Sequence, residues 1–95
     1  MLDIRYGENG ELVLAGRFDA SQAAKADAAL AAVSGTVVLD LKDLAYISSL
    51  GLGTLVKTEK RLRAGGGGLT LVNVSPHIRD VLTYAGLHMI FKIGP

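Results

Sequence analysis

Two short runs of mostly apolar residues constrain the fold of this chain more than any other feature: Thr36–Leu41 (TVVLDL) and Leu69–Val74 (LTLVNV). Their β-branched, nearly continuous apolar character is typical of strands covered on both faces. A segment with helical spacing lies between them, with an apolar stripe made by Leu52, Leu55, Val56 and Leu62. Strand, helix and strand in this order predict two parallel strands joined by a right-handed crossover.

The residues before this unit predict a β-hairpin. Apolar and polar side chains alternate over Leu2–Tyr6, and apolar character resumes at Leu12–Leu14. Between these runs lies Asn9-Gly10, and Asn-Gly is the strongest short hairpin signal because both turn residues need positive φ.

Two further helices and a last strand complete the pattern. Asp19 precedes the alanine-rich segment Ala20–Val33, and Gln22 follows it by three residues, which is the spacing of a capping box. Ser75-Pro76 supplies a serine cap and a proline for the next helix. Met89–Ile93 reads as a final short strand. We therefore predict an α/β fold with an N-terminal β-hairpin and then a βαβαβ unit. Its mixed sheet should have four to five strands, with helices mainly on one face.

The composition fits a single domain over residues 1–95, with hydrophobic residues at 49% of the chain. A net charge of +1 argues against nucleic acid as a partner. The chain contains no cysteine, and no apolar run approaches the ~18–20 residues that span a bilayer. The N-terminus also lacks the pattern of a secretory signal. We expect a cytoplasmic protein without membrane contact of its own.

The stretch Tyr46–Thr54 (YISSLGLGT) holds the candidate chemistry, since two serines and two glycines follow a buried strand. A nucleophile elbow would need a glycine two residues before its serine, and none is present. The four glycines at 65–68 follow a helix, whereas phosphate-binding loops precede one. The two histidines are isolated. We therefore expect no enzymatic activity, no metal and no cofactor. Either one serine caps the next helix, or a hydroxyl is exposed at its positive end, where an attached phosphate is favoured.

These residues resemble the STAS domain of bacterial anti-sigma factor antagonists over almost the full chain. The matching pieces are LVLAGRFDASQA, VVLDLKDLAYISSLGLGTL and GGGGLTLVNVSPHIRDVLTYAGLHMIFKI. In that family the central stretch usually reads Asp-Ser-Ser/Thr-Gly-Leu-Gly, and the serine after the Asp is phosphorylated. The resemblance implies that Ser49 is the phosphoacceptor. Ser48, which occupies the Asp position, is the alternative, and Asp19 matches a family Asp near the acceptor.

The resemblance also implies a partner switch. The unmodified protein would bind a serine-kinase anti-sigma factor with an ATP-binding fold of the histidine-kinase type. Phosphorylation would release it, and a phosphoserine phosphatase is a further implied partner. The alternative is an accessory or scaffold subunit of an ABC lipid transporter or a sensory assembly, without an obligatory phosphate cycle. The chain ends at Gly94-Pro95, before a last helix common in the family, and we expect the exposed apolar patch to favour a homodimer or a permanent partner.

We expect the partner surface on the helix Gly51–Ala64 and the turn before it. We expect the polar residues of this helix that lie outside its apolar stripe to make no core contacts. Reversing Lys57 and Arg61 to Glu should therefore weaken partner binding and leave the melting temperature nearly unchanged. The predicted partner-binding residues are Asp19, Ser48, Leu50, Gly51, Gly53, Thr54, Lys57 and Arg61.

Overall fold

The computed structural model describes residues 1–94 as six strands, three α-helices and a short 3₁₀ helix. In chain order these are β1 (Leu2–Tyr6), β2 (Leu12–Phe18), η1 (Ala20–Gln22), α1 (Ala23–Ala31), β3 (Thr36–Asp40), β4 (Leu44–Ile47), α2 (Ser49–Ala64), β5 (Gly68–Val72), α3 (Pro76–Tyr84) and β6 (Lys92–Ile93). Within residues 1–94, no helix combines the length and the apolar character needed to cross a membrane.

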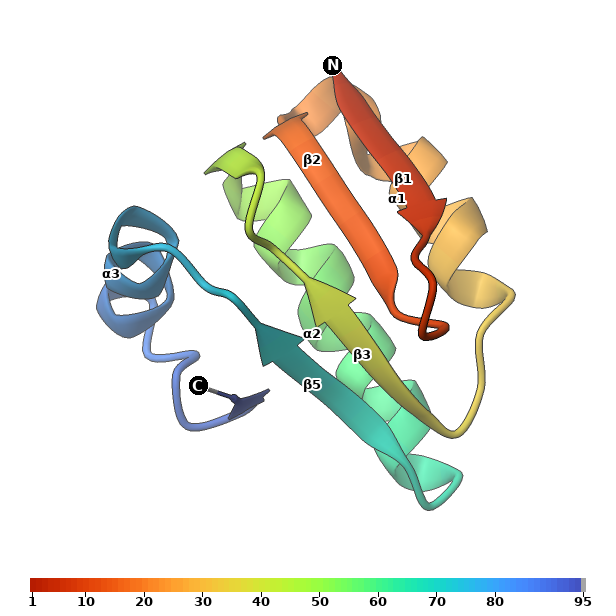
Figure 1. The fold of residues 1–95 in the computed structure, drawn as a ribbon. Helices are drawn as coiled ribbons and strands as arrows, with labels where there is room; N and C mark the ends of the chain where they lie inside the picture. The colour runs from red at the N-terminus through yellow and green to blue at the C-terminus, as the bar shows by residue number, and fades with distance from the viewer. Residues whose placement is uncertain (95) are drawn as a thin grey trace.

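The strands form one mixed sheet in the order β1-β2-β3-β5-β6, with β4 also beside β2 (Figure 1). The predicted hairpin is confirmed, since β1 and β2 pair antiparallel with Ile4 opposite Leu14. The predicted crossover is confirmed as well, because β3 and β5 pair in parallel over five residues, with Leu39 opposite Leu71. The α/β fold class predicted from the sequence is therefore correct.

One strand of the sheet was not predicted. After β3 the chain turns at Leu41, whose carbonyl accepts from Leu44 N at 3.1 Å, and β4 then continues alongside β2. β3 pairs with the start of β2 and β4 with its end, where Phe18 lies opposite Ile47. The sheet therefore has six strands, not four to five. The sequence LAYI shows no clear alternation, because the buried residues Leu44 and Ile47 are three positions apart.

The core lies between the sheet and the helices on one of its faces. Figure 1 shows α1 and α2 on the same side of the sheet and α3 near the carboxyl ends of β4 and β5. The largest fully buried side chains are Leu2, Leu12, Leu14, Phe18, Leu30, Leu39, Leu41, Leu55, Leu69, Leu71, Ile78 and Leu82. Because these aliphatic side chains come from every layer, the core holds the sheet and the three helices as one unit.

The predicted capping box is only half correct. Asp19 caps the 3₁₀ turn, where its Oδ1 accepts from Ser21 N at 3.1 Å. Gln22 does not reach back to Asp19, because its Oε1 accepts from Leu2 N on β1 at 3.1 Å. The α-helix therefore begins at Ala23, three residues later than predicted. The last strand of the sheet is also shorter than predicted, because only Lys92–Ile93 pairs with β5.

Candidate functional site

Ser48 connects β4 to α2 and is the N-cap of that helix. Its backbone N–H donates to Phe18 O at 2.9 Å, which fixes it beside the end of β2. Its hydroxyl Oγ accepts from Gly51 N at 3.1 Å, so it satisfies one of the free donors of the first turn. The Ser48 hydroxyl therefore has a structural role in the fold.

Ser49 is the first residue of α2, and its side chain is exposed. Within residues 1–94 its hydroxyl makes no hydrogen bond that meets ordinary geometry. The two alternatives drawn from the sequence thus apply to different residues, since Ser48 caps the helix and Ser49 presents a hydroxyl at its N-terminal end. A hydroxyl that is both exposed and free of hydrogen bonds can accept a substituent without loss of a native contact.

The electrostatics around Ser49 favour an anion. The first turn of α2 contains no acidic residue, whereas its last turn contains Arg61 and Arg63. The positive end of the helix dipole is therefore not neutralised by side chains of that turn. An attached phosphate would face free backbone N–H groups of the kind that bind anions at helix N-termini.

Asp19 follows β2 directly, so it leaves the sheet at the same edge as Ser48. A hydrogen bond from the Ser21 hydroxyl lowers the pKa of Asp19, with a smaller contribution from the terminal ammonium group. The hydroxyl lies 2.6 Å from Oδ1. Asp19 is therefore ionised at neutral pH, and it is a negative charge beside the candidate acceptor.

An exposed apolar surface continues from Ser49 along α2. Leu50 is 58% exposed, so most of this apolar side chain is accessible to a partner. A side chain added at Gly53 would meet nothing within 4 Å, so this turn of the helix lies open. A groove of about 550 Å³ runs between α2 and the end of α3, and is lined by Ser49, Leu52, Gly53, Val56, Lys57, Lys60, Ala85 and Leu87. The sequence analysis did not predict that Lys60, Ala85 and Leu87 belong to this surface. The available signal was the spacing of Leu52 and Val56, which places both on one face of the helix.

Two predicted surface residues lie inside the molecule. Thr54 is only 5% exposed, so the expectation that it lies off the core is wrong. Gly51 is buried as well, and a Cβ there would lie 2.9 Å from Ile47 Cγ1 and 3.1 Å from the Phe18 ring. Gly51 is thus required for α2 to approach the sheet closely.

Arg61 was predicted to be free of structural work, and this is also wrong. Its guanidinium Nη2 donates to Leu30 O at 2.7 Å and to Val33 O at 2.9 Å. Leu30 lies in the last turn of α1 and Val33 just beyond that helix, so Arg61 ties α2 to the C-terminal end of α1. Lys57, in contrast, remains largely exposed, with Nζ 3.0 Å from Asp27 Oδ1. Lys57 and Lys60 are the cations of α2 that line the groove.

The far end of α2 is anchored by a buried carboxylate that the sequence did not indicate. Glu59 is 1% exposed, and its Oε1 accepts from Leu69 N at 2.7 Å. Its other oxygen pairs with Arg63, whose Nε lies 2.7 Å away. The bond to Leu69 ties the C-terminal half of α2 to the start of β5, and the pair with Arg63 lies within the helix.

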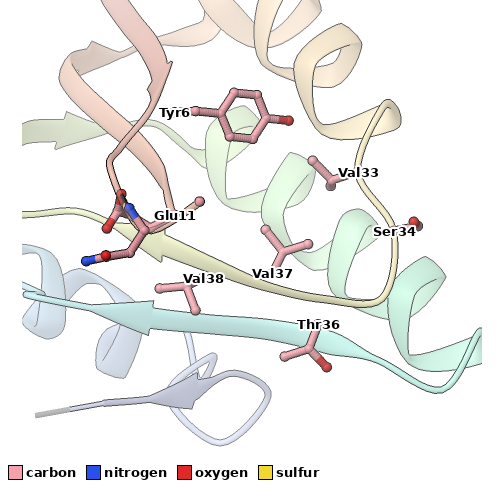
Figure 2. A pocket seen from close by; sticks show the side chains of 9 residues that line it. Tyr6, Glu11, Val33, Ser34, Thr36, Val37 and Val38 are labelled. Carbon is pink, nitrogen blue, oxygen red and sulfur yellow. Dashed lines mark hydrogen bonds between the residues drawn. The ribbon is translucent and has the colours of Figure 1, made fainter.

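A second hollow, of about 410 Å³, lies far from the serine pair, between the hairpin turn and the start of β3. Figure 2 shows Tyr6, Val33 and Val37 around it. Among residues 1–94, no group of three His, Cys, Asp or Glu side chains is arranged to hold a metal ion.

The chain belongs to the STAS domain family. Residues 4–93 match the family model described as Mlab, STAS domain. The anti-sigma-B factor antagonist of Bacillus subtilis is 31% identical over 97 residues, covering 98% of this chain and 89% of that protein. The chain spans about half the length of two other curated relatives that it matches, 50% and 48%.

Solved structures share the fold. An anti-sigma factor antagonist from Mycobacterium paratuberculosis superposes with a TM-score of 0.80 at 22% identity, covering 100% of this chain and 85% of that one. The unphosphorylated form of the anti-sigma factor antagonist SpoIIAA superposes with a TM-score of 0.72 at 23% identity, covering 100% and 89%. The family resemblance noted from the sequence is thus confirmed by the family model and the relative in Bacillus subtilis, and the solved structures share the fold.

Proposed function

We propose that this STAS domain is an anti-sigma factor antagonist in a partner-switching pathway. Its unmodified form binds a serine-kinase anti-sigma factor and so frees the sigma factor. Phosphorylation of Ser49 by that kinase releases the protein, and a phosphoserine phosphatase restores the binding form. The chain itself does no chemistry in this cycle, because it supplies the acceptor hydroxyl and the docking surface.

The observation that carries the proposal is the difference in environment between the two serine hydroxyls. The Ser48 hydroxyl is bound to Gly51 N at 3.1 Å, whereas Ser49 is exposed at the start of α2. A kinase that reaches this turn meets one accessible hydroxyl, beside the exposed side chain of Leu50. Ser49 is therefore the better phosphoacceptor of the two.

The energetics suit a switch that acts on binding. A phosphoserine adds about −1.5 to −2 charges at pH 7. At a helix N-terminus the dipole stabilises such a charge by roughly 0.3–1 kcal/mol, so the fold tolerates the modification. In a complex the same dianion must be desolvated against a surface that fitted a neutral hydroxyl. Each 1.4 kcal/mol of that penalty lowers affinity about tenfold, so one phosphate is sufficient.

The relatives support this role. The full-length relative in Bacillus subtilis is an anti-sigma-B factor antagonist, and SpoIIAA has been solved in unphosphorylated and phosphorylated forms. We infer that the partner surface of this chain is the N-terminal part of α2 and the groove beside it, with Ser49, Leu50, Gly53 and Lys57 as contact residues. Thr54 and Gly51 support this surface from within, because both are buried.

The experiment is a phosphorylation and binding assay with the cognate kinase. Purified protein is incubated with the kinase and ATP, and the phosphate is mapped by mass spectrometry. We expect modification at Ser49. The S49A variant should still bind the kinase without incorporating phosphate, and S49D should bind more weakly than S49A. The matched control is S48A, which removes the neighbouring hydroxyl and should still be phosphorylated.

The outcomes are distinct. Phosphate on Ser48 would move the acceptor by one residue and contradict the assignment of Ser49. Loss of binding on L50A, with unchanged unfolding, would support the proposed surface, since this side chain is largely outside the core. A tight complex that persists in ATP, without modification at either serine, would overturn the switch. The accessory-subunit role without a phosphate cycle would then replace it.

A further inference from the structure

The outer edge of β1 presents unpaired backbone groups. β1 is the first strand in the sheet order, so β2 is its only neighbour among residues 1–94. Bonds from Arg17 N to Met1 O and from Gly7 N to Glu11 O join the two strands at either end. Inward and outward bonding alternates along an antiparallel strand. The odd-numbered residues of β1 therefore bond to β2, and the N–H and C=O groups of its even-numbered residues point outward.

Helix α1 already occupies this edge at one position. The outward N–H of Leu2 donates to Gln22 Oε1, and the outward C=O of Leu2 accepts from Lys25 Nζ. The corresponding groups of Ile4 and Tyr6 have no such partner within residues 1–94. Two successive outward positions of β1 are thus available to another strand, and the third is closed.

An apolar groove runs beside these two positions, between β1 and α1, which lie side by side at the edge of the fold (Figure 1). It measures about 290 Å³ and is lined by Ile4, Arg5, Tyr6, Leu12, Lys25, Ala29 and Ala32. The short alanine side chains of α1 leave the groove open. Tyr6 is 62% exposed, and Figure 2 shows its ring extending from the strand toward Val33. A strand added to β1 would point every second side chain into this groove.

The charges at this edge favour an incoming strand that carries an acidic residue. Arg5 and Lys25 line the groove, and no acidic side chain does. Asp3 lies 3.8 Å from Arg5, but both side chains are more than half exposed, so this pair is weak. A carboxylate on an incoming strand, opposite Arg5, would form the cross-strand pair of opposite charges that stabilises such sheets.

A second copy of this chain fits the edge poorly. An antiparallel register that uses Ile4 and Tyr6 of both copies places Arg5 directly opposite Arg5, and like charges in that position are destabilising. A register that uses Leu2 is closed in both copies by Gln22 and Lys25. Self-pairing through β1 is therefore opposed in these two registers.

We propose that the β1 edge is a second binding site, independent of the serine surface, for an extended peptide segment of another protein. The segment pairs antiparallel with Ile4 and Tyr6, places apolar side chains in the groove and carries an acidic residue opposite Arg5. This mode of binding derives its affinity from main-chain hydrogen bonds and its specificity from alternate side chains.

The test uses the acetylated, amidated peptide Thr-Val-Glu-Val-Thr and ¹⁵N-labelled full chain. We expect the amide resonances of Ile4 and Tyr6 to shift on titration and to exchange more slowly with solvent. The peptide Thr-Val-Lys-Val-Thr should bind about tenfold more weakly, equivalent to one lost pair of about 1.4 kcal/mol. A29L should fill the groove and weaken binding by a similar factor, and S49A should leave it unchanged.

R5E is the second variant, because it alters only an exposed charge and does not touch the core. It should reverse the preference, so that the Lys peptide binds more tightly than the Glu peptide. Absence of shifts at Ile4 and Tyr6 at millimolar peptide would overturn the proposal. So would shifts confined to the start of α2, or concentration-dependent shifts without peptide, which would indicate self-pairing.

Discussion

At the scale of single residues, two adjacent hydroxyl groups at the start of α2 differ in what they contribute to stability. The Ser48 hydroxyl accepts from Gly51 N, and that of Ser49 faces solvent. The same serine-to-alanine change at these two positions therefore separates capping from surface exposure.

We expect S48A to lower the free energy of unfolding by about 0.5–2 kcal/mol, as for other N-cap replacements. S49A should change it by less than about 0.5 kcal/mol, in the range of exposed sites. Chemical denaturation of both variants beside the unmodified chain measures the difference. Equal losses would contradict the assignment of Ser48 as the cap.

Asp19 gives the molecule a specific response to acid. Its pKa is lowered, chiefly by the Ser21 hydroxyl, so its hydrogen bonds stabilise the fold above the unfolded-state pKa of about 3.9. That contribution is lost as the pH falls through the lower, folded-state pKa.

The stability difference between the unmodified chain and S21A should therefore be present at pH 6 and shrink below about pH 4. Thermal unfolding across this range measures it. S34A, at an exposed serine after α1, is the control and should show no such trend. A difference that stayed constant from pH 6 to pH 2 would show that Asp19 does not carry the effect.

At the scale of elements, α2 is defined by contacts at both ends. Gly51 lets its first turn lie against Phe18 and Ile47, and Glu59 fastens its far end to β5. Gly53 lies on the opposite, open side of the same turn. The two glycines thus differ in environment and share the same helix.

Alanine at the two glycines should have opposite effects. G51A forces a methyl group into a filled space, and overpacking of this kind costs about 1–3 kcal/mol, more than the helix gains. G53A meets no atoms and should stabilise by roughly 0.5–1 kcal/mol. Denaturation midpoints measured at one pH decide this. Stabilisation by both changes would mean that α2 shifts away from the sheet without penalty.

The elements that could be read from the sequence are those whose signal is local. The runs over β3 and β5, the hairpin and the Ser75-Pro76 cap each carry their pattern within a few residues, and these were found correctly. The Asn-Gly turn was only partly correct, because Gly10 has a positive φ and Asn9 does not. β4 was missed because Lys42 and Asp43 interrupt the apolar run, although the sheet continues past them. The strand is evident only beside its partner β2.

The residues of the candidate site were likewise only partly predictable from the sequence. The serine pair and its place between a strand and a helix follow from the sequence. The role of Arg61 does not, because its acceptors, Leu30 and Val33, are 31 and 28 residues away along the chain. Thr54 was misplaced because a polar residue next to the apolar stripe can turn inward when a neighbouring element covers it. Such contacts depend on how the layers meet.

At the scale of the whole molecule, phosphorylation and folding are predicted to be separable. The proposed acceptor Ser49 is exposed at the N-terminus of α2 and is not a member of the buried core cluster. The fold therefore gains only a charge at the favourable end of a helix dipole.

The phosphorylated chain should unfold within about 1 kcal/mol of the unmodified one, with equal or higher stability. Its affinity for the kinase partner should fall at least about a hundredfold, the equivalent of roughly 3 kcal/mol. Denaturation and calorimetric titration of the two purified forms measure both quantities. A large loss of stability on phosphorylation would mean that the switch works by unfolding.

The open first turn of α2 has a consequence for how such proteins diverge. Leu50 and Gly53 contribute little to the core, whereas Gly51 and Thr54, close to them in the chain, are buried. Duplicated genes can therefore accumulate substitutions at the first set without losing a foldable product. Insulated pathways within one cell can arise in this way, with each copy acquiring its own partner while the inward residues are held fixed by selection.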